Sequence, residues 1–326
     1  MASKIPAPRT VEVLALQREL YASSHEAGKS ASAGAVVAAL AANVSIALAK
    51  FAGAVYTGSG ALLAEALHSL ADTGNQGLLL WGMRQSKTPA SVDFPLGHGR
   101  ALYFWSFIVA LMLFSMGGLL SIYEGIHKLG GHSGIQSPAV ALAILVFALG
   151  AEGYSLSIAL RRINRLRRGK PLWRWFIDTR RSELMVVLGE DSAAMLGLCL
   201  AGAAVVLTMV TGNPAYDALG SILVGTLLVL VAIALGYEIK GLLIGQSAAP
   251  DVRRAILDVL HSQQQVARVV DLITLQQGDD IFVAARVVLG RAESADQVTE
   301  DIRRCKQALQ AAVPTIAWVF LEPQAR

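Results

Sequence analysis

The sequence predicts an α-helical membrane protein, a six-span transmembrane bundle followed by a small α/β domain. Its 326 residues are 54% hydrophobic and only 16% charged, which is too apolar for a soluble chain of this length. Six stretches are long enough to cross a bilayer. From about residue 250 onward the composition becomes charged and mixed, as expected for a domain in water.

The six predicted spans are runs of about 20 or more mostly apolar residues. They cover residues 33–55, 61–81, 101–126, 138–160, 184–210 and 218–237. Glycines at 117–118 and 220–225 predict close helix packing. We expect three domains: a cytoplasmic segment 1–31, a bundle 32–246 and a cytoplasmic domain 247–326.

The C-terminal domain is predicted to run helix, strand, strand, helix, strand. Pro250 begins a stretch with apolar residues at helical spacing. Two β-rich stretches, 266–276 and 281–289, flank a Gly-Asp-Asp turn and indicate a hairpin. Ser294 is a predicted cap for a helix that ends near residue 312, and 316–321 is the last strand. Because so small a domain has little core, we expect it to form a homodimer.

The distribution of basic residues predicts the orientation in the membrane. Residues 161–181 contain nine Lys and Arg side chains against the single acid Asp178, and the alternate links carry almost no charge. The positive-inside rule then places both termini in the cytoplasm, and we expect a bacterial inner membrane. This rule accounts for the arginines, so the expected partner is the lipid bilayer and not nucleic acid. The two cysteines, Cys199 and Cys305, form no disulfide framework.

Ionisable side chains inside a span are costly and therefore usually functional. Glu65, His68 and Asp72 stand at i, i+3 and i+7 in the second span and share one helix face. By helical rise, His68 and Asp72 lie about 12–18 Å below the outer boundary, near the midplane. Asp191 in the fifth span lies about 13 Å from the opposite boundary. The two spans therefore present polar groups at one level.

An imidazole combined with carboxylates suits a borderline divalent cation such as zinc. The predicted metal ligands are His68, Asp72 and Asp191, with a fourth from among Glu190, Glu65 and Asn43. Asp191 is preferred to Glu190, since neighbours point about 100° apart on a helix. Glu190 is alternatively a partner of a neighbouring helix or a proton carrier. For Asn43 an interhelical hydrogen bond is the stronger interpretation.

Other charged residues in the spans receive structural interpretations. Lys50 and Glu124 fall near span ends, where a surface ion pair or a snorkelling side chain suffices. Glu152 lies further in, and it either lines an intracellular vestibule or pairs with a basic residue.

Four motifs in this order resemble the cation diffusion facilitator family. They are YTGSGALLAEALHSLADTGNQ at 56–76, PLGHGR at 95–100, GEDSAAMLG at 189–197 and NPAYDALGSILVG at 213–225. The motifs in spans two and five look most like the branch with the animal mitochondrial zinc transporter. The resemblance implies a homodimeric, proton-coupled exporter of divalent metals, whose C-terminal domain has a ferredoxin-like fold.

The resemblance also implies which residues bind the metal ion. The family's metal-binding pair of the second span falls on His68 and Asp72, and the aspartate of its fifth-span pair falls on Asp191. Val187 occupies the position of the fifth-span histidine, so one usual ligand is missing. The family's linker metal site is matched by His98, with Asp93 as a companion.

The C-terminal domain departs from the family members that bind metal there. Val270, Arg286 and Leu321 stand about where some members place metal-binding histidines. We therefore expect this domain to have no dinuclear zinc site.

The predicted function is proton-coupled efflux of a divalent transition metal by alternating access around the midplane site. Zinc is the first choice, with manganese, iron, cobalt and nickel left open, and no cofactor is expected beyond the transported ion. Ligands must lose protons to bind a cation, which couples the two fluxes. A membrane receptor or scaffold with purely structural charges is the alternative. An intramembrane metalloprotease is disfavoured because no HExxH motif occurs, so the chain is predicted not to be an enzyme.

Overall fold

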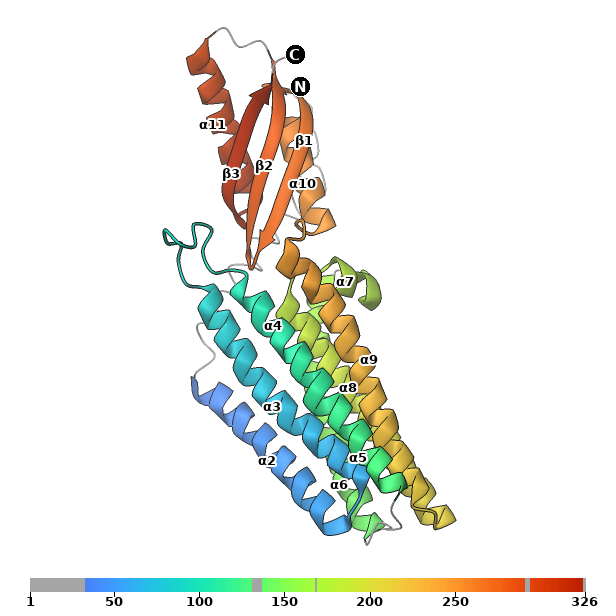
Figure 1. Ribbon diagram of the computed structural model, residues 1–326. Coiled ribbons are helices and arrows are strands. Elements are labelled where there is room, and N and C mark those ends of the chain that lie inside the picture. The colour runs from blue at the N-terminus through green and yellow to red at the C-terminus, as the bar shows by residue number, and fades with distance from the viewer. Residues whose placement is uncertain (1–32, 131–136, 168, 291–293, 325–326) are drawn as a thin grey trace, which may run out of the picture. The chain divides into compact units, whose positions relative to one another are not determined.

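The computed structural model describes residues 33–130, 137–167, 169–290 and 294–324 (Figure 1). The predicted segment 1–31 lies outside these ranges. The chain divides into a helical unit, Gly34–Thr88 with Arg100–Leu243, and a second unit that joins Pro89–Gly99 to Ile244–Arg326. The boundaries predicted for the three domains remain predictions.

Six long helical stretches form the described part of the helical unit (Figure 1). A π-helical turn, η1, interrupts the third stretch, and the short helix α7 (Leu172–Asp178) lies between the fourth and the fifth. In chain order the stretches are α2 (Ala33–Thr57), α3 (Gly60–Ser86), α4 (Ala101–Met112) with η1 (Leu113–Leu119) and α5 (Leu120–Leu129), α6 (Pro138–Arg167), α8 (Ser182–Thr211) and α9 (Ala215–Ile244).

The helical membrane fold is confirmed, and the count of six spans is confirmed in part. Among the described residues, the third to sixth stretches are long and apolar enough to cross a membrane: Ala101–Leu129, Pro138–Arg167, Ser182–Thr211 and Ala215–Ile244. Helices α2 and α3 have spanning lengths of 25 and 27 residues. For α2 and α3, spanning stays a prediction.

Glycines bring the helices into close contact. A Cβ atom added at Gly225 would lie 2.6 Å from the carbonyl oxygen of Gly118, and one added at Gly118 would lie 2.6 Å from Val229 Cγ2. Similarly, a Cβ atom at Gly220 would collide with the side chain of Ala204 on α8. Close packing at the predicted glycines is therefore confirmed, because no larger side chain fits there.

A buried carboxylate ties the start of α3 to the start of α9. Asp217 accepts hydrogen bonds from Ser59 Oγ (2.6 Å), the Gly60 amide (2.6 Å) and the Ala61 amide (3.2 Å). The first amides of a helix have no partner within the helix, and their partial positive charge favours an anion. The ammonium of Lys128, at the end of α5, lies 3.4 Å from the same carboxylate. These five residues form the Asp217 clasp.

The C-terminal domain has the predicted order helix, strand, strand, helix, strand (Figure 1). β1 and β2 pair antiparallel across a turn in which Gly278 has φ +66°, and β2 and β3 pair parallel. Ser294 caps the second helix by accepting a hydrogen bond from the Gln297 amide, as predicted. The elements are α10 (Pro250–Ser262), β1 (Val266–Gln277), β2 (Asp280–Leu289), α11 (Ala295–Ala312) and β3 (Ile316–Gln324).

One face of the sheet is buried, and the other carries exposed apolar side chains. One face packs with residues of α10 and α11 to form the core, which includes Val283, Val287 and Cys305. On the other face Ile273 and Phe320 are 58% and 57% exposed, and the rings of Phe282 and Phe320 lie 5.4 Å apart. This second face is called the open sheet face below.

Within the second unit, the link after α3 contacts the β1–β2 turn through glycine. A Cβ atom at Gly99 would collide with the carbonyl oxygen of Gln277, and one at Gly278 would lie 2.7 Å from the carbonyl oxygen of Gly99. Two backbones therefore touch at this point, which only glycine permits.

Candidate metal site in the helical unit

Four polar residues repeat along one face of α3. Glu65, His68 and Asn75 are fully buried, and the side chain of Asp72 is 18% exposed. Their positions are i, i+3, i+7 and i+10, which follow the helical repeat. Asn75 is not among the residues predicted from the sequence, although its spacing continues the series of the other three. The predicted polar face thus extends one turn further towards the end of α3.

His68 and Asp72 form the centre of this face. His68 Nε2 lies 3.3 Å from Asp72 Oδ2. Both ring nitrogens of His68, Asp72 Oδ1 and Asn75 Oδ1 are buried without a hydrogen-bond partner. Because buried polar atoms are rarely left unpaired, four such atoms on three successive turns call for a ligand.

From α8, Glu190 faces this part of α3. Asn75 Nδ2 donates a hydrogen bond of 2.6 Å to Glu190 Oε1, and Glu190 is 5% exposed. Glu190 also lies within electrostatic range of Asp72. Asp191 instead accepts a 3.4 Å hydrogen bond from Ser155 Oγ on α6. The geometry therefore favours Glu190 as the α8 ligand, whereas the sequence favoured Asp191.

The remaining candidates have other partners. Asn43 donates a 2.9 Å hydrogen bond to Gln76 Oε1 on α3, which is the interhelical role considered for it. Glu65 lies 3.5 Å from the ammonium of Lys50. Lys50 is only 1% exposed, so its predicted place near the surface is wrong. Glu152 lies 3.6 Å from the same ammonium, which agrees with the pairing interpretation.

Within the described ranges, no three His, Cys, Asp or Glu side chains lie close enough together to hold a metal ion. The polar residues instead form two pairs one turn apart, His68 with Asp72 and Asn75 with Glu190. A metal that bound all of them would have to break the bond between Asn75 and Glu190. In this arrangement the Glu190 carboxylate is hydrogen-bonded to a neutral amide.

Two further predictions concern the linker residue His98 and the C-terminal domain. The ring of His98 packs on Phe94 at 4.4 Å, and its Nδ1 is buried without a hydrogen-bond partner. Arg286 pairs with Asp271 at 3.1 Å on the sheet. Metal binding at His98 with Asp93, and the absence of a zinc site in the C-terminal domain, stay predictions.

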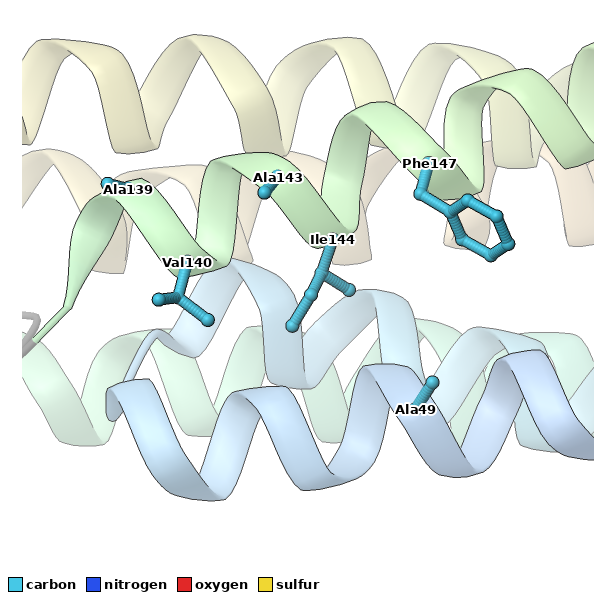
Figure 2. A pocket seen from close by; sticks show the side chains of 6 residues that line it. All are labelled: Ala49, Ala139, Val140, Ala143, Ile144 and Phe147. Carbon is cyan, nitrogen blue, oxygen red and sulfur yellow. The ribbon is translucent and has the colours of Figure 1, made fainter.

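A cavity of about 430 Å³ lies between α2 and α6 (Figure 2). Its lining is entirely aliphatic or aromatic and offers no ligand for a cation. The lining residues are Ala49, Ala139, Val140, Ala143, Ile144 and Phe147. This cavity is therefore not the metal site.

The fold and the buried side chains define an integral membrane helix bundle with a carboxylate-rich interior. The chain belongs to the cation efflux family, since the family model described as "Cation efflux transmembrane domain" matches residues 36–244. That range includes α3 and most of α2, the two helices whose spanning is still a prediction.

The relatives in this family are named as metal transporters. The chain is 38% identical over 266 residues to "Proton-coupled zinc antiporter SLC30A9, mitochondrial" of Xenopus laevis. The aligned region covers 78% of this chain and 48% of the relative. It is 36% identical over 225 residues to the human protein of that name, covering 68% and 40%. It is 26% identical over 264 residues to "Cation-efflux pump FieF" of Serratia proteamaculans, covering 79% and 81%. The chain thus spans less than half the length of the first two relatives.

Proposed function

We propose that the chain exports divalent transition-metal ions, zinc first, in exchange for protons. The observation that carries this proposal is the set of buried, unpaired polar atoms on His68, Asp72 and Asn75 opposite Glu190. Ionisable groups inside a membrane mark ion pathways, and a set of one imidazole and two carboxylates suits zinc. The names of the relatives support the choice of zinc and of protons.

In the proposed cycle, the ion enters from the cytoplasm and binds His68, Asp72 and Glu190. The amide of Asn75 releases Glu190 as the ion binds. Because imidazole and carboxylates bind a metal only when deprotonated, the site holds either the ion or protons. Protons that arrive from the outer side therefore expel the ion and reset the site, and the bundle alternates between two openings.

The single histidine leaves the choice of metal open. Val187 stands one turn before Asp191 and packs against the apolar core. Zinc accepts nitrogen and oxygen ligands together, whereas manganese tolerates oxygen-rich sites. Zinc is the proposed cargo, and manganese, iron, cobalt and nickel are the competitors to compare with it.

We also propose a bacterial inner membrane with both termini in the cytoplasm. The support for the orientation is the run of nine basic residues within 161–181, between the fourth and fifth spans. Reactivity of single-cysteine variants on either side of the membrane tests this orientation.

Reconstitution tests the transport proposal. Liposomes that contain the full chain and a metal-sensitive dye are expected to take up zinc when a pH gradient is imposed. Asp72→Asn is expected to lower the initial rate about 100-fold, because it removes a carboxylate ligand. Protein-free liposomes are the control. If folded protein carried no metal at all, the receptor or scaffold alternative would be favoured.

We propose that the chain works as a homodimer formed through the open sheet face. Ile273 and Phe320 are large and exposed, and the ring of Phe320 lies against that of Phe282. A small three-stranded domain buries little apolar surface by itself, and a second copy that covers such a face increases the buried apolar area.

Phe320→Glu is therefore expected to convert the purified protein from dimer to monomer, since it places a charge in the centre of the apolar contact. Light scattering in detergent measures the mass. Gln310→Glu adds the same charge to an exposed position of α11 and is expected to leave the dimer intact. A dimer that survived Phe320→Glu would contradict the assignment of this face.

A further inference from the structure

Lys50 is a buried ammonium that faces two carboxylates. Its Nζ atom lies 3.5 Å from Glu65 and 3.6 Å from Glu152, and it donates a 2.6 Å hydrogen bond to Ser69. Lys50 is 1% exposed and Glu65 is fully buried. Burial of a charge is costly in free energy unless the charge is paired, and here the ammonium on α2 is paired with acids on α3 and α6.

The packing of α8 holds Glu65 in this cluster. A Cβ atom at Gly197 would collide with Glu65 Oε1, so the carboxylate occupies a slot that only glycine leaves open. Glu65 stands one turn before His68 on the same helix face. It would therefore be a natural oxygen ligand for an ion at His68 and Asp72 if Lys50 did not engage it.

The cluster also acts on the candidate metal site through space. Lys50 lies within electrostatic range of both His68 and Asp72. Glu152 lies within electrostatic range of Asp72 and Asp191. Glu65 is thus one turn from His68 on α3, and Lys50 ties Glu152 of α6 to the same cluster.

Resting on the proposed function, we propose that Lys50 determines which metal is transported. Its ammonium keeps Glu65 and Glu152 away from the ion, so the ion meets His68 with only two carboxylates. Such a set suits a borderline cation like zinc. Extra carboxylates would create an oxygen-rich set that suits a harder cation such as Mn²⁺. Lys50 is in this sense a positioning residue, which acts through the two acids and does not touch the ion.

The test compares initial rates of Zn²⁺ and Mn²⁺ uptake by the full chain in liposomes. Lys50→Met is expected to raise the Mn²⁺/Zn²⁺ rate ratio about tenfold, because it releases two carboxylates. Lys50→Arg keeps the charge and is expected to keep the ratio of the unaltered protein. Adding Glu65→Gln to Lys50→Met should lower the ratio, and adding Glu152→Gln as well should return it to the starting value.

A purely structural role would lower both rates together, and an unchanged ratio in folded Lys50→Met would overturn the proposal. If Lys50→Met does not fold, the double variant Lys50→Met/Glu65→Gln is compared with Glu65→Gln, from which it differs only in Lys50. A higher ratio in the double variant supports the proposal, and equal ratios overturn it. Absence of any metal uptake by the unaltered protein would instead overturn the proposed function, and with it this inference.

Discussion

Glu190→Gln is expected to reduce metal transport about 100-fold or more, because a ligand of the transported ion is lost. The amide keeps the size of the side chain and its contact with Asn75, so the fold should survive. Asp191→Asn is expected to keep most of the activity. Its carboxylate accepts a hydrogen bond from Ser155 on α6, whereas the carboxylate of Glu190 accepts one from Asn75 on the polar face of α3.

Dye-loaded liposomes with an imposed pH gradient measure both rates, and zinc binding to the detergent-solubilised protein separates binding from turnover. Ser155→Ala is the matched control, since it removes the partner of Asp191 and leaves Glu190 untouched. Full loss in Asp191→Asn together with high activity in Glu190→Gln would restore the assignment made from the sequence. It would mean that α8 rotates before the ion binds.

Asp217→Ala is expected to cause a large loss of stability. The change removes three hydrogen bonds at the start of α3 and leaves the ammonium of Lys128 without its carboxylate. Breaking such a buried pair costs about 3 kcal/mol. For a unit of this size, that corresponds to a fall of roughly 6–12 °C in the melting temperature.

Thermal unfolding in detergent, followed by circular dichroism or by tryptophan fluorescence, tests the Asp217 clasp. Asp217→Asn keeps one acceptor oxygen, so its melting temperature is expected to fall by about half as much. Asp258→Ala, inside α10, removes an exposed acid elsewhere and serves as the control. A melting temperature for Asp217→Ala equal to that of the unaltered protein would show that the clasp does not stabilise the bundle.

Much of the fold was predictable because membrane spans and short strands have local signatures. The predicted spans agree with the helices, but the helices run further: α3 continues to Ser86 and α9 to Ile244. A hydropathy pattern ends where apolar residues end, whereas hydrogen bonds continue the helix into polar surroundings. The hairpin was predictable from the glycine turn and from alternating residues such as Val283 and Val287.

The candidate site was predictable in part. Spacing placed Glu65, His68 and Asp72 on one face of α3, and it would also have found Asn75. Spacing alone could not decide between Glu190 and its neighbour Asp191, because that choice depends on how α8 is rotated against α3. It also could not show that Lys50 turns inward to Glu65 and Glu152, since these residues come from three different helices.

The sequence by itself determined the membrane class, the order of the elements and the polar face of α3. These follow from the length of apolar runs and from the helical repeat, which are properties of single segments. The tertiary structure alone decided that Glu190 meets Asn75, that Lys50 holds two acids and that Asp217 caps α3. Each of these depends on how one helix is rotated and shifted against another, and packing of side chains at glycine contacts decides that rotation.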